Sequence, residues 1–160
     1  MNIRYDMVSC YVVRPNDGGD GHEFLQLRRV KSDFMGGTWQ AIYGTCEEGE
    51  SPVTAVLREL REEASLVPKE LYRLDQVSVF YIESSDTMWH CVPFCAVVTR
   101  EQPLTLNDEH DAARWIDARE AERIFMWKDN RDAIVDIRGH ILVESLAKPY
   151  MRIPLLSSQR

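Results

Sequence analysis

Residues 44–66 read GTCEEGESPVTAVLRELREEASL, and this stretch decides how the rest of the chain is interpreted. It contains six glutamates, which repel one another unless water or a cation lies among them. Ser51 and Pro52 predict a helix start, because serine is a favoured N-cap and proline fits the first helical position. The apolar residues that follow recur at helical spacing and predict one buried stripe. They are Val53, Val56, Leu57, Leu60 and Ala64.

Three glutamates share another face of the predicted helix. At about 100° per residue, Glu59, Glu62 and Glu63 fall within a wedge of roughly 100°. Arg58 precedes Glu62 by one turn and is placed to orient it. Clustered carboxylates suit Mg²⁺ or Mn²⁺, ions that also bind substrate phosphates. A solvated charged face would have the same pattern, so the helix alone leaves both interpretations open.

The loop and helix together resemble the Nudix box, whose pattern is Gly-x5-Glu-x7-Arg-Glu-apolar-x-Glu-Glu-x-Gly-apolar. The matching positions are Gly44, Glu50, Arg58, Glu59, Leu60, Glu62, Glu63 and Leu66. Ser65 replaces the second glycine of the pattern. A left-handed residue at a helix end costs serine about 1 kcal/mol more than glycine. The departure therefore concerns helix termination rather than the carboxylates.

This resemblance implies the Nudix fold, an α/β/α sandwich built on a mixed sheet, with residues 1–160 as one domain. It implies hydrolysis of a nucleoside diphosphate linked to another group, with Mg²⁺ or Mn²⁺ as cofactor. A sequence of this length has room for a proper core.

The resemblance also implies roles for the residues of the box. Glu59, Glu62 and Glu63 would bind metal, and Glu59 or a neighbouring glutamate such as Glu62 would assist the attacking water. Which glutamate is the general base varies within the family and stays open. Arg58 would support catalysis by orienting these carboxylates. Two residues would support the motif, Gly44 by permitting close backbone approach and Glu50 by orienting the loop.

Two positions outside the helix complete the expected metal site. The family commonly supplies a main-chain carbonyl from the residue before the box glycine, which is Tyr43 here. Glu109, followed by His110, resembles a glutamate that many members supply from a loop opposite the box. Asp108 and Asp111 are competitors for the role of Glu109.

Three residues are expected to contact substrate. Arg28 and Arg29 point to opposite faces of a predicted strand, and Arg29 is the candidate for the phosphates. Trp39 and Gln40 precede the box, where Trp39 either lines a ring pocket or belongs to the core. Gln40 offers an amide able to read a ring edge.

Short matches resemble bacterial dihydroneopterin triphosphate pyrophosphatases and dATP pyrophosphohydrolases. They are Trp39-Gln40, EEGE at 47–50, Glu109-His110 ahead of Trp115, and WKDNRDAI at 127–134. The resemblance implies cleavage of a nucleoside or pterin triphosphate to a monophosphate and pyrophosphate. Sugar nucleotides and dinucleoside polyphosphates remain open as substrates. A nucleotide sensor without turnover is the alternative from another class, although the complete carboxylate set speaks against it.

The composition limits the classes of molecule that the protein is expected to bind. The net charge of −7 argues against a nucleic-acid polymer, which needs a basic patch, and favours a small phosphorylated ligand bridged by metal. No apolar run reaches membrane-spanning length, and the N-terminus lacks the pattern of a signal peptide. The four cysteines show no zinc spacing, and a reduced, cytoplasmic location is expected. The oligomeric state stays open, with a homodimer as one option.

Two hairpins are predicted around the box. Residues 5–14 and 23–30 are rich in β-forming residues and should pair across a turn-rich connection. Residues 71–83 and 87–99 should form a second hairpin. Pro93 lies within the last segment and indicates an edge position or a bulge.

The C-terminal part should contain a short strand and helices. Residues 113–117 are predicted to form a strand, and Asp117 is expected to cap the helix that follows. A longer helix is predicted over 129–147, and Pro149 should end it. Its predicted apolar stripe consists of Ile134, Ile137, Ile141, Val143 and Leu146. The tail MRIPLLSSQR, from residue 151 onward, is expected to be loosely ordered.

Overall fold

The central strand of the sheet is β1 (Asn2–Pro15), whose second half is buried on both sides. The structure is a computed structural model that describes residues 1–156. Val8 and Val12 pack into the core on one face of β1, whereas Tyr11 and Val13 pack into the core on the other face. Because side chains alternate along a strand, this pattern needs a layer of structure on each side of the sheet.

Within residues 1–156, one sheet contains nine strands in the order β3-β2-β1-β7-β5-β9, with β4 paired to β1, β6 to β7 and β8 to β2. The other strands are β2 His22–Arg29, β3 Trp39–Gln40, β4 Ile42–Thr45, β5 Glu70–Arg73, β6 Ser78–Ile82, β7 Thr87–Val97, β8 His110–Asp117 and β9 Arg152–Ile153. β1 and β7 run parallel, and the other pairs run antiparallel. The sheet is therefore mixed, as predicted, and the first hairpin is confirmed.

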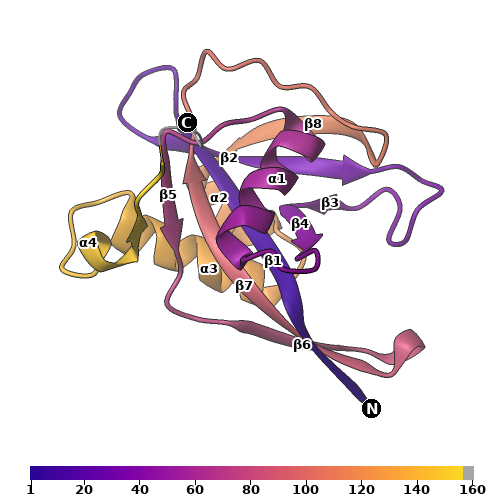
Figure 1. Ribbon diagram of the computed structural model, residues 1–160. Helices are drawn as coiled ribbons and strands as arrows, with labels where there is room; N and C mark the ends of the chain where they lie inside the picture. The colour runs from indigo at the N-terminus through magenta and orange to yellow at the C-terminus, as the bar shows by residue number, and fades with distance from the viewer. Residues whose placement is uncertain (157–160) are drawn as a thin grey trace.

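Helices cover both faces of the sheet (Figure 1). α1 (Pro52–Ala64) packs on the face that carries Val8, and α2 (Ala118–Ile124) and α3 (Lys128–Asp136) pack on the face that carries Tyr11. The short helical turns are η1 Glu83–Ser85, η2 Ile137–Ile141 and α4 Lys148–Met151. This arrangement confirms the α/β/α sandwich. In the part of the chain described, none of the helices has both the length and the apolar character needed to cross a bilayer.

The helix caps follow the local sequence signals. The Ser51 hydroxyl accepts a hydrogen bond from the Thr54 amide at 3.2 Å, which confirms the predicted start of α1. Ser65 ends α1 in the left-handed region, with φ 56° and ψ 29°, so serine takes the conformation usually given to glycine. Asp117 caps α2 by accepting from the Arg119 amide at 2.8 Å.

The second predicted hairpin is interrupted. Residues 71–83 form two strands, β5 and β6, which pair with successive parts of β7. β7 is paired on both sides, so the edge position expected at Pro93 is wrong. A bulge there is also wrong, because the register between β1 and β7 continues through Pro93 opposite Ser9. Pro93 lies between Cys91, which pairs with β6, and Phe94, which pairs with β5, so the proline stands where the partner strand changes.

The predicted C-terminal helix over 129–147 is helical only as far as Ile141, and the rest of the prediction is wrong. α3 ends at Asp136, and a π-helical turn follows to Ile141. Ile134, Ile137 and Ile141 are buried, which confirms the first part of the predicted stripe. Val143 and Leu146 are exposed, Leu146 by 95%, so neither extends it. Pro149 lies inside the first turn of α4, where a proline is tolerated, rather than ending a helix.

The tail is ordered where it meets the sheet. Met151 is buried, and Arg152–Ile153 form β9 against Leu71 and Tyr72 of β5. The expectation of a loosely ordered tail is therefore wrong for this part. The rest of the tail that falls at 157–160 lies outside the described residues.

Candidate active site

Arg58, in the middle of α1, binds several carboxylates at once. Its Nη2 donates to Glu50 Oε2 at 3.0 Å, and its Nη1 donates to Glu59 Oε1 at 2.9 Å and Glu62 Oε2 at 3.0 Å. Nη2 also donates to the Thr45 carbonyl at 2.9 Å, which ties the helix to the end of β4. A planar guanidinium has enough donors to make these bonds together. Arg58 therefore orients Glu62, as its spacing predicts, and Glu59 as well.

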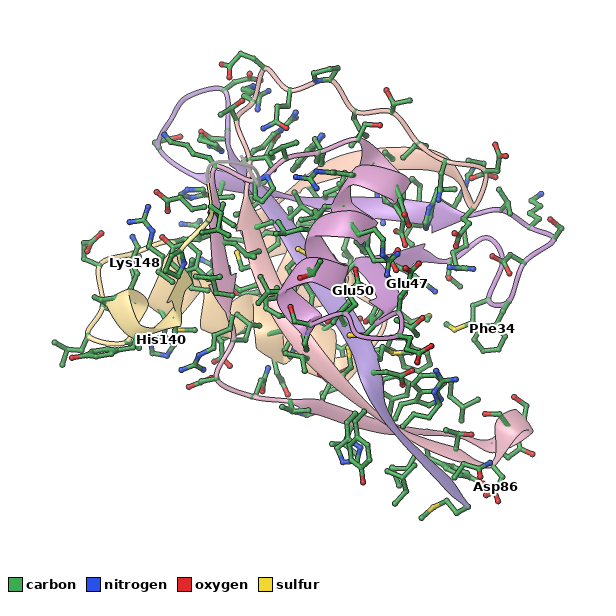
Figure 2. All side chains as sticks on the ribbon, in the orientation of Figure 1. Phe34, Glu47, Glu50, Asp86, His140 and Lys148 are labelled. Carbon is green, nitrogen blue, oxygen red and sulfur yellow. The ribbon has the colours of Figure 1, made fainter. Side chains whose placement is uncertain are left out.

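Glu50 lies in the loop between β4 and α1, close to Glu47 (Figure 2). Glu50 Oε2 accepts from the Glu47 amide at 2.9 Å as well as from Arg58. The hydrogen bonds from Arg58 lower the pKa of Glu50, and the bond from the Glu47 amide adds to this effect. Glu50 therefore stays ionised and acts as a brace between loop and helix.

Gly44 brings β4 directly beneath Glu59. A Cβ built at position 44 would lie 2.1 Å from both Cδ and Oε1 of Glu59, so no side chain fits between them. Burial raises the pKa of Glu59, while the hydrogen bond from Arg58 opposes that rise. Gly44 thus allows the Glu59 carboxylate to lie directly against the backbone of β4.

Glu63 is the buried member of the group, with 3% of the residue exposed. Its Oε2 has no hydrogen-bond partner among the described residues, and the nearest cationic candidate, His110 Nε2, is 3.9 Å away. Burial raises the pKa of Glu63 to about 9, and the charges of Glu59 and Glu109 contribute to the rise. The alternative of a simply solvated face is therefore wrong for Glu63, although the side chain of Glu62 is 54% exposed.

Glu109 faces this group from the loop before β8. Its charge raises the pKa of both Glu59 and Glu63, and its Oε2 lies 3.7 Å from Arg29 Nη1. Asp111, one competitor, instead pairs with Arg28 Nε at 2.6 Å. We call Glu59, Glu62, Glu63 and Glu109 the carboxylate cluster. The structure thus brings together residues that are widely separated in sequence.

The donor set of the carboxylate cluster fits a divalent cation. In residues 1–156 no three His, Cys, Asp or Glu side chains already converge as a metal cage, and Arg58 holds two of the glutamates. Yet Glu63 presents a buried oxygen without a partner beside other carboxylates, which is unfavourable unless a proton or a cation compensates. Hard carboxylate oxygens are the ligands that Mg²⁺ and Mn²⁺ prefer. The side chain of Tyr43 points to the other face of the sheet, so its ring does not belong to this site.

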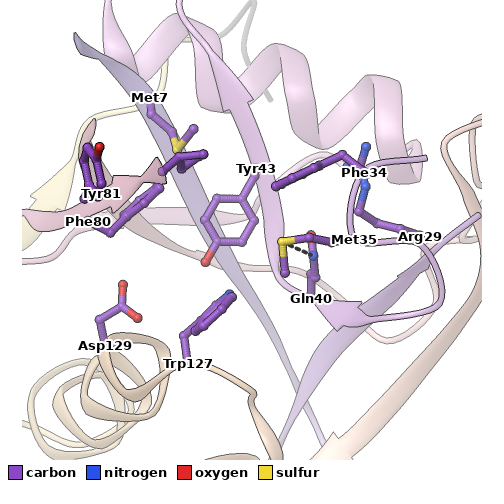
Figure 3. A pocket seen from close by; sticks show the side chains of 11 residues that line it. Met7, Arg29, Phe34, Met35, Gln40, Tyr43, Phe80, Tyr81, Trp127 and Asp129 are labelled. Atoms are coloured by element: carbon purple, nitrogen blue, oxygen red, sulfur yellow. Dashed lines mark hydrogen bonds between the residues drawn. The ribbon is translucent and has the colours of Figure 1, made fainter. Parts of the chain in front are cut away.

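A cavity of about 590 Å³ lies beside the cluster, between the sheet and the start of α3 (Figure 3). Arg29 and Gln40, two of the residues expected to contact substrate, line it. Sequence reasoning missed several of its walls, namely Phe34, Met35, Phe80, Trp127, Asp129 and the ring of Tyr43. Arg29 joins the two regions, because it lines the cavity and also pairs with Glu109.

Trp39 lies outside both the buried core and this cavity. Its ring lies 4.2 Å from the Arg114 guanidinium carbon and 5.6 Å from that of Arg28. The residue is half-buried, belongs to neither buried core and does not line the cavity. The core interpretation of Trp39 is therefore wrong, and its ring lies outside this cavity. Gln40 does line the cavity, where its Nε2 donates to Thr38 Oγ1 at 2.8 Å.

Asn130 is a further residue that sequence reasoning missed. It is buried in α3, and its Nδ2 donates to the hydroxyls of Tyr11 at 2.8 Å and Tyr43 at 2.7 Å. The one feature of the sequence that could have pointed to Asn130 is its position in the segment WKDNRDAI, where an amide follows Trp127 and Asp129 at the start of a helix. From the sequence, that segment indicates only the start of a helix and a short resemblance to dihydroneopterin triphosphate pyrophosphatases, not the contacts of Asn130.

Comparison with known proteins agrees with this geometry. Residues 6–137 match the model of the NUDIX domain. Dihydroneopterin triphosphate diphosphatase of Escherichia coli K12 is 31% identical over 119 residues, which cover 67% of this chain and 76% of that protein. An octanoyltransferase of Myxococcus xanthus is 37% identical over 113 residues, or 69% of this chain, but the chain spans only 30% of that relative. The solved E. coli dihydroneopterin triphosphate pyrophosphohydrolase superposes with a TM-score of 0.61 at 28% identity, covering 79% of this chain and 91% of that one.

Proposed function

Because this chain belongs to the NUDIX domain family, we propose that it hydrolyses a pterin or nucleoside triphosphate to the monophosphate and pyrophosphate, using Mg²⁺ or Mn²⁺. The relative that shares 31% identity is named for dihydroneopterin triphosphate, which supports a triphosphate of this kind. Family membership makes the chain a hydrolase of pyrophosphate bonds, and the choice of substrate is the proposed part.

The observation that carries the proposal is the buried Glu63 oxygen without a partner. Repulsion from Glu59 and Glu109 adds to the cost of charging it, and no cation among the described residues pairs closely with it. A purely structural carboxylate in such a place would be expected to find a donor. A site built to receive a cation would leave the oxygen free.

Glu59, Glu62, Glu63 and Glu109 would hold the ion. When bound, a divalent ion neutralises phosphate charge, polarises the phosphorus and makes water more acidic. Glu59 is then the candidate to take the proton from the attacking water, because Arg58 and Gly44 keep its carboxylate in one position. The phosphates of the substrate would meet Arg29 at the mouth of the cavity.

Product analysis tests this proposal. Wild-type protein is incubated with Mg²⁺ and dihydroneopterin triphosphate, dGTP, dATP, ADP-ribose or diadenosine tetraphosphate. From the triphosphate that is turned over, we expect no direct release of orthophosphate and full release after inorganic pyrophosphatase is added. Orthophosphate without pyrophosphatase would contradict the proposed bond cleavage. Tight binding without turnover of any compound would favour a nucleotide sensor instead.

A further inference from the structure

The cavity beside the carboxylate cluster has flat apolar walls and few polar groups. Trp127, Phe80 and the ring of Tyr43 lie around it, which suits an aromatic ring that stacks. Its volume of about 590 Å³ lies within the range of about 300–1,000 Å³ typical of small-molecule sites. The few polar groups must therefore decide which ring is accepted.

Asp129 is the one acid on this wall that the described residues leave without a partner. Its carboxylate makes no hydrogen bond and no ion pair within residues 1–156. The neighbouring Lys128 pairs with Asp132, and the cavity's arginine, Arg29, pairs with Asp33 and Glu109. The carboxylate is thus a free acceptor, and a carboxylate can accept two parallel N–H bonds.

Tyr43 supplies a donor beside this acceptor. The Tyr43 oxygen accepts from Asn130 Nδ2 at 2.7 Å and also from the hydroxyl of Tyr11, which is fully buried and needs an acceptor for its hydrogen. The hydroxyl hydrogen of Tyr43 is therefore directed to another partner. Figure 3 shows the Tyr43 hydroxyl and the Asp129 carboxylate directed toward the same end of the cavity. Asn130 is itself buried and also bonded to Tyr11, so the Tyr43 ring is held in place.

We infer that Tyr43 and Asp129 select rings whose edge carries a carbonyl, a ring N–H and an amino group in succession. Guanine and pterin carry this edge, and adenine does not. Tyr43 donates to the carbonyl, and Asp129 accepts from the N–H and the amino group. The inference rests on the proposed function and deepens it, because it names the ring class that the same site takes.

Adenine fits this pair poorly for an electrostatic reason. Its edge presents one amino group and a ring nitrogen with a lone pair, which would face the Asp129 carboxylate or leave the Tyr43 hydroxyl unpaired. A polar site discriminates strongly when a wrong ligand leaves its groups unpaired. The simpler explanation is that Asp129 only favours the helix N-terminus, where acids are stabilising. That explanation predicts a change in stability without a change in ring preference.

The test compares Asp129→Asn with Asp132→Asn, which lies on the same helix and pairs with Lys128 outside the cavity. With Mg²⁺ present, kcat/KM is measured for dihydroneopterin triphosphate, dGTP and dATP. We expect Asp129→Asn to lower the first two by about 10- to 100-fold, while dATP changes by less than about threefold. Asp132→Asn should leave all three close to wild type. An equal loss for all three substrates, or a wild-type preference for dATP, would overturn the inference.

A binding measurement separates this inference from the proposed function. The dissociation constants of dGMP and dAMP are measured without metal for wild type, Asp129→Asn and Tyr43→Phe. Tighter dGMP binding that both substitutions weaken supports the inference even if no triphosphate is hydrolysed, in which case the proposed function alone fails. Turnover of a triphosphate together with equal binding of dGMP and dAMP would support the proposed function and overturn the inference. If Asp129→Asn does not fold, Tyr43→Phe and the wild-type preference decide.

Discussion

The side chain of Glu59 packs against the α-carbon of Gly44, which leaves no space for a side chain at position 44. A Cβ there would lie 2.1 Å from Glu59 Cδ, far inside van der Waals contact. Gly44→Ala must therefore displace Glu59, and we expect kcat to fall by about 100-fold, the effect of a 1 Å misplacement. Gly139→Ala is the control, because its new methyl group would meet no atom within 4 Å. Unchanged kcat in a folded Gly44→Ala variant would show that Glu59 does not need this close approach.

Arg58 cannot be replaced by lysine without loss. A single ammonium cannot bond Glu50, Glu59 and Glu62 together in the geometry of the guanidinium. For Arg58→Lys we expect the free energy of unfolding to fall by about 1–3 kcal/mol and kcat to decrease. Arg61→Lys, on the exposed side of the same helix, should change neither. Denaturant melts and steady-state kinetics on both variants check this, and equal behaviour of the two would contradict it.

The stability of the metal-free protein should decrease as pH rises. Burial raises the pKa of Glu63 to about 9 from an ordinary 4.5, so the folded state holds a proton that the unfolded state releases. This contribution is fully present below about pH 4.5 and is lost as pH rises through about 9. We therefore expect Tm in EDTA to fall from about pH 6 to about pH 9.

Substitutions of single glutamates can show which residue causes the fall of Tm with rising pH. Glu63→Gln should flatten the dependence of Tm on pH, whereas the exposed Glu62→Gln should keep it. Excess Mg²⁺ should also reduce the slope in wild type, because a bound cation replaces the proton. The same slope in Glu63→Gln and wild type would mean that another group holds the proton.

Trp39 should matter little to substrate binding. Its ring stacks on Arg114 outside the cavity, at 4.2 Å from the guanidinium carbon. For Trp39→Ala we expect KM to stay within about twofold of wild type and stability to fall by about 1–2 kcal/mol, less than the roughly 3–5 kcal/mol typical of a core tryptophan. A KM increase of about tenfold or more would place the ring at the substrate after all.

Local signals are sufficient to predict α1. Ser51 caps the helix through its neighbour Thr54, and the apolar stripe is set by spacing within one helix. The matched register from Gly44 to Leu66 also identifies the carboxylates that lie together in the structure. These features depend on residues that are close in sequence, so a sequence pattern can predict them.

Long-range packing decides the features that sequence reasoning missed. Glu63 is buried, and one of its neighbours there is His110, which comes from β8. Trp39 stacks on Arg114, which also comes from β8, and nothing near Trp39 in the sequence indicates that partner. The cavity joins Tyr43 of β4 to Asp129 of α3. Such contacts need the strand order, which periodicity alone does not specify.

Manganese binding measured by electron paramagnetic resonance tests the central claim most directly, namely that the carboxylate cluster holds the divalent cation needed for hydrolysis. Free Mn²⁺ is titrated with wild type, Glu63→Gln and the control Asp132→Asn at one pH. We predict that wild type and the control bind Mn²⁺, that Glu63→Gln binds it at least about tenfold more weakly, and that turnover follows the bound fraction. Equal Mn²⁺ affinity in Glu63→Gln and wild type, or full turnover in excess EDTA, would contradict the account.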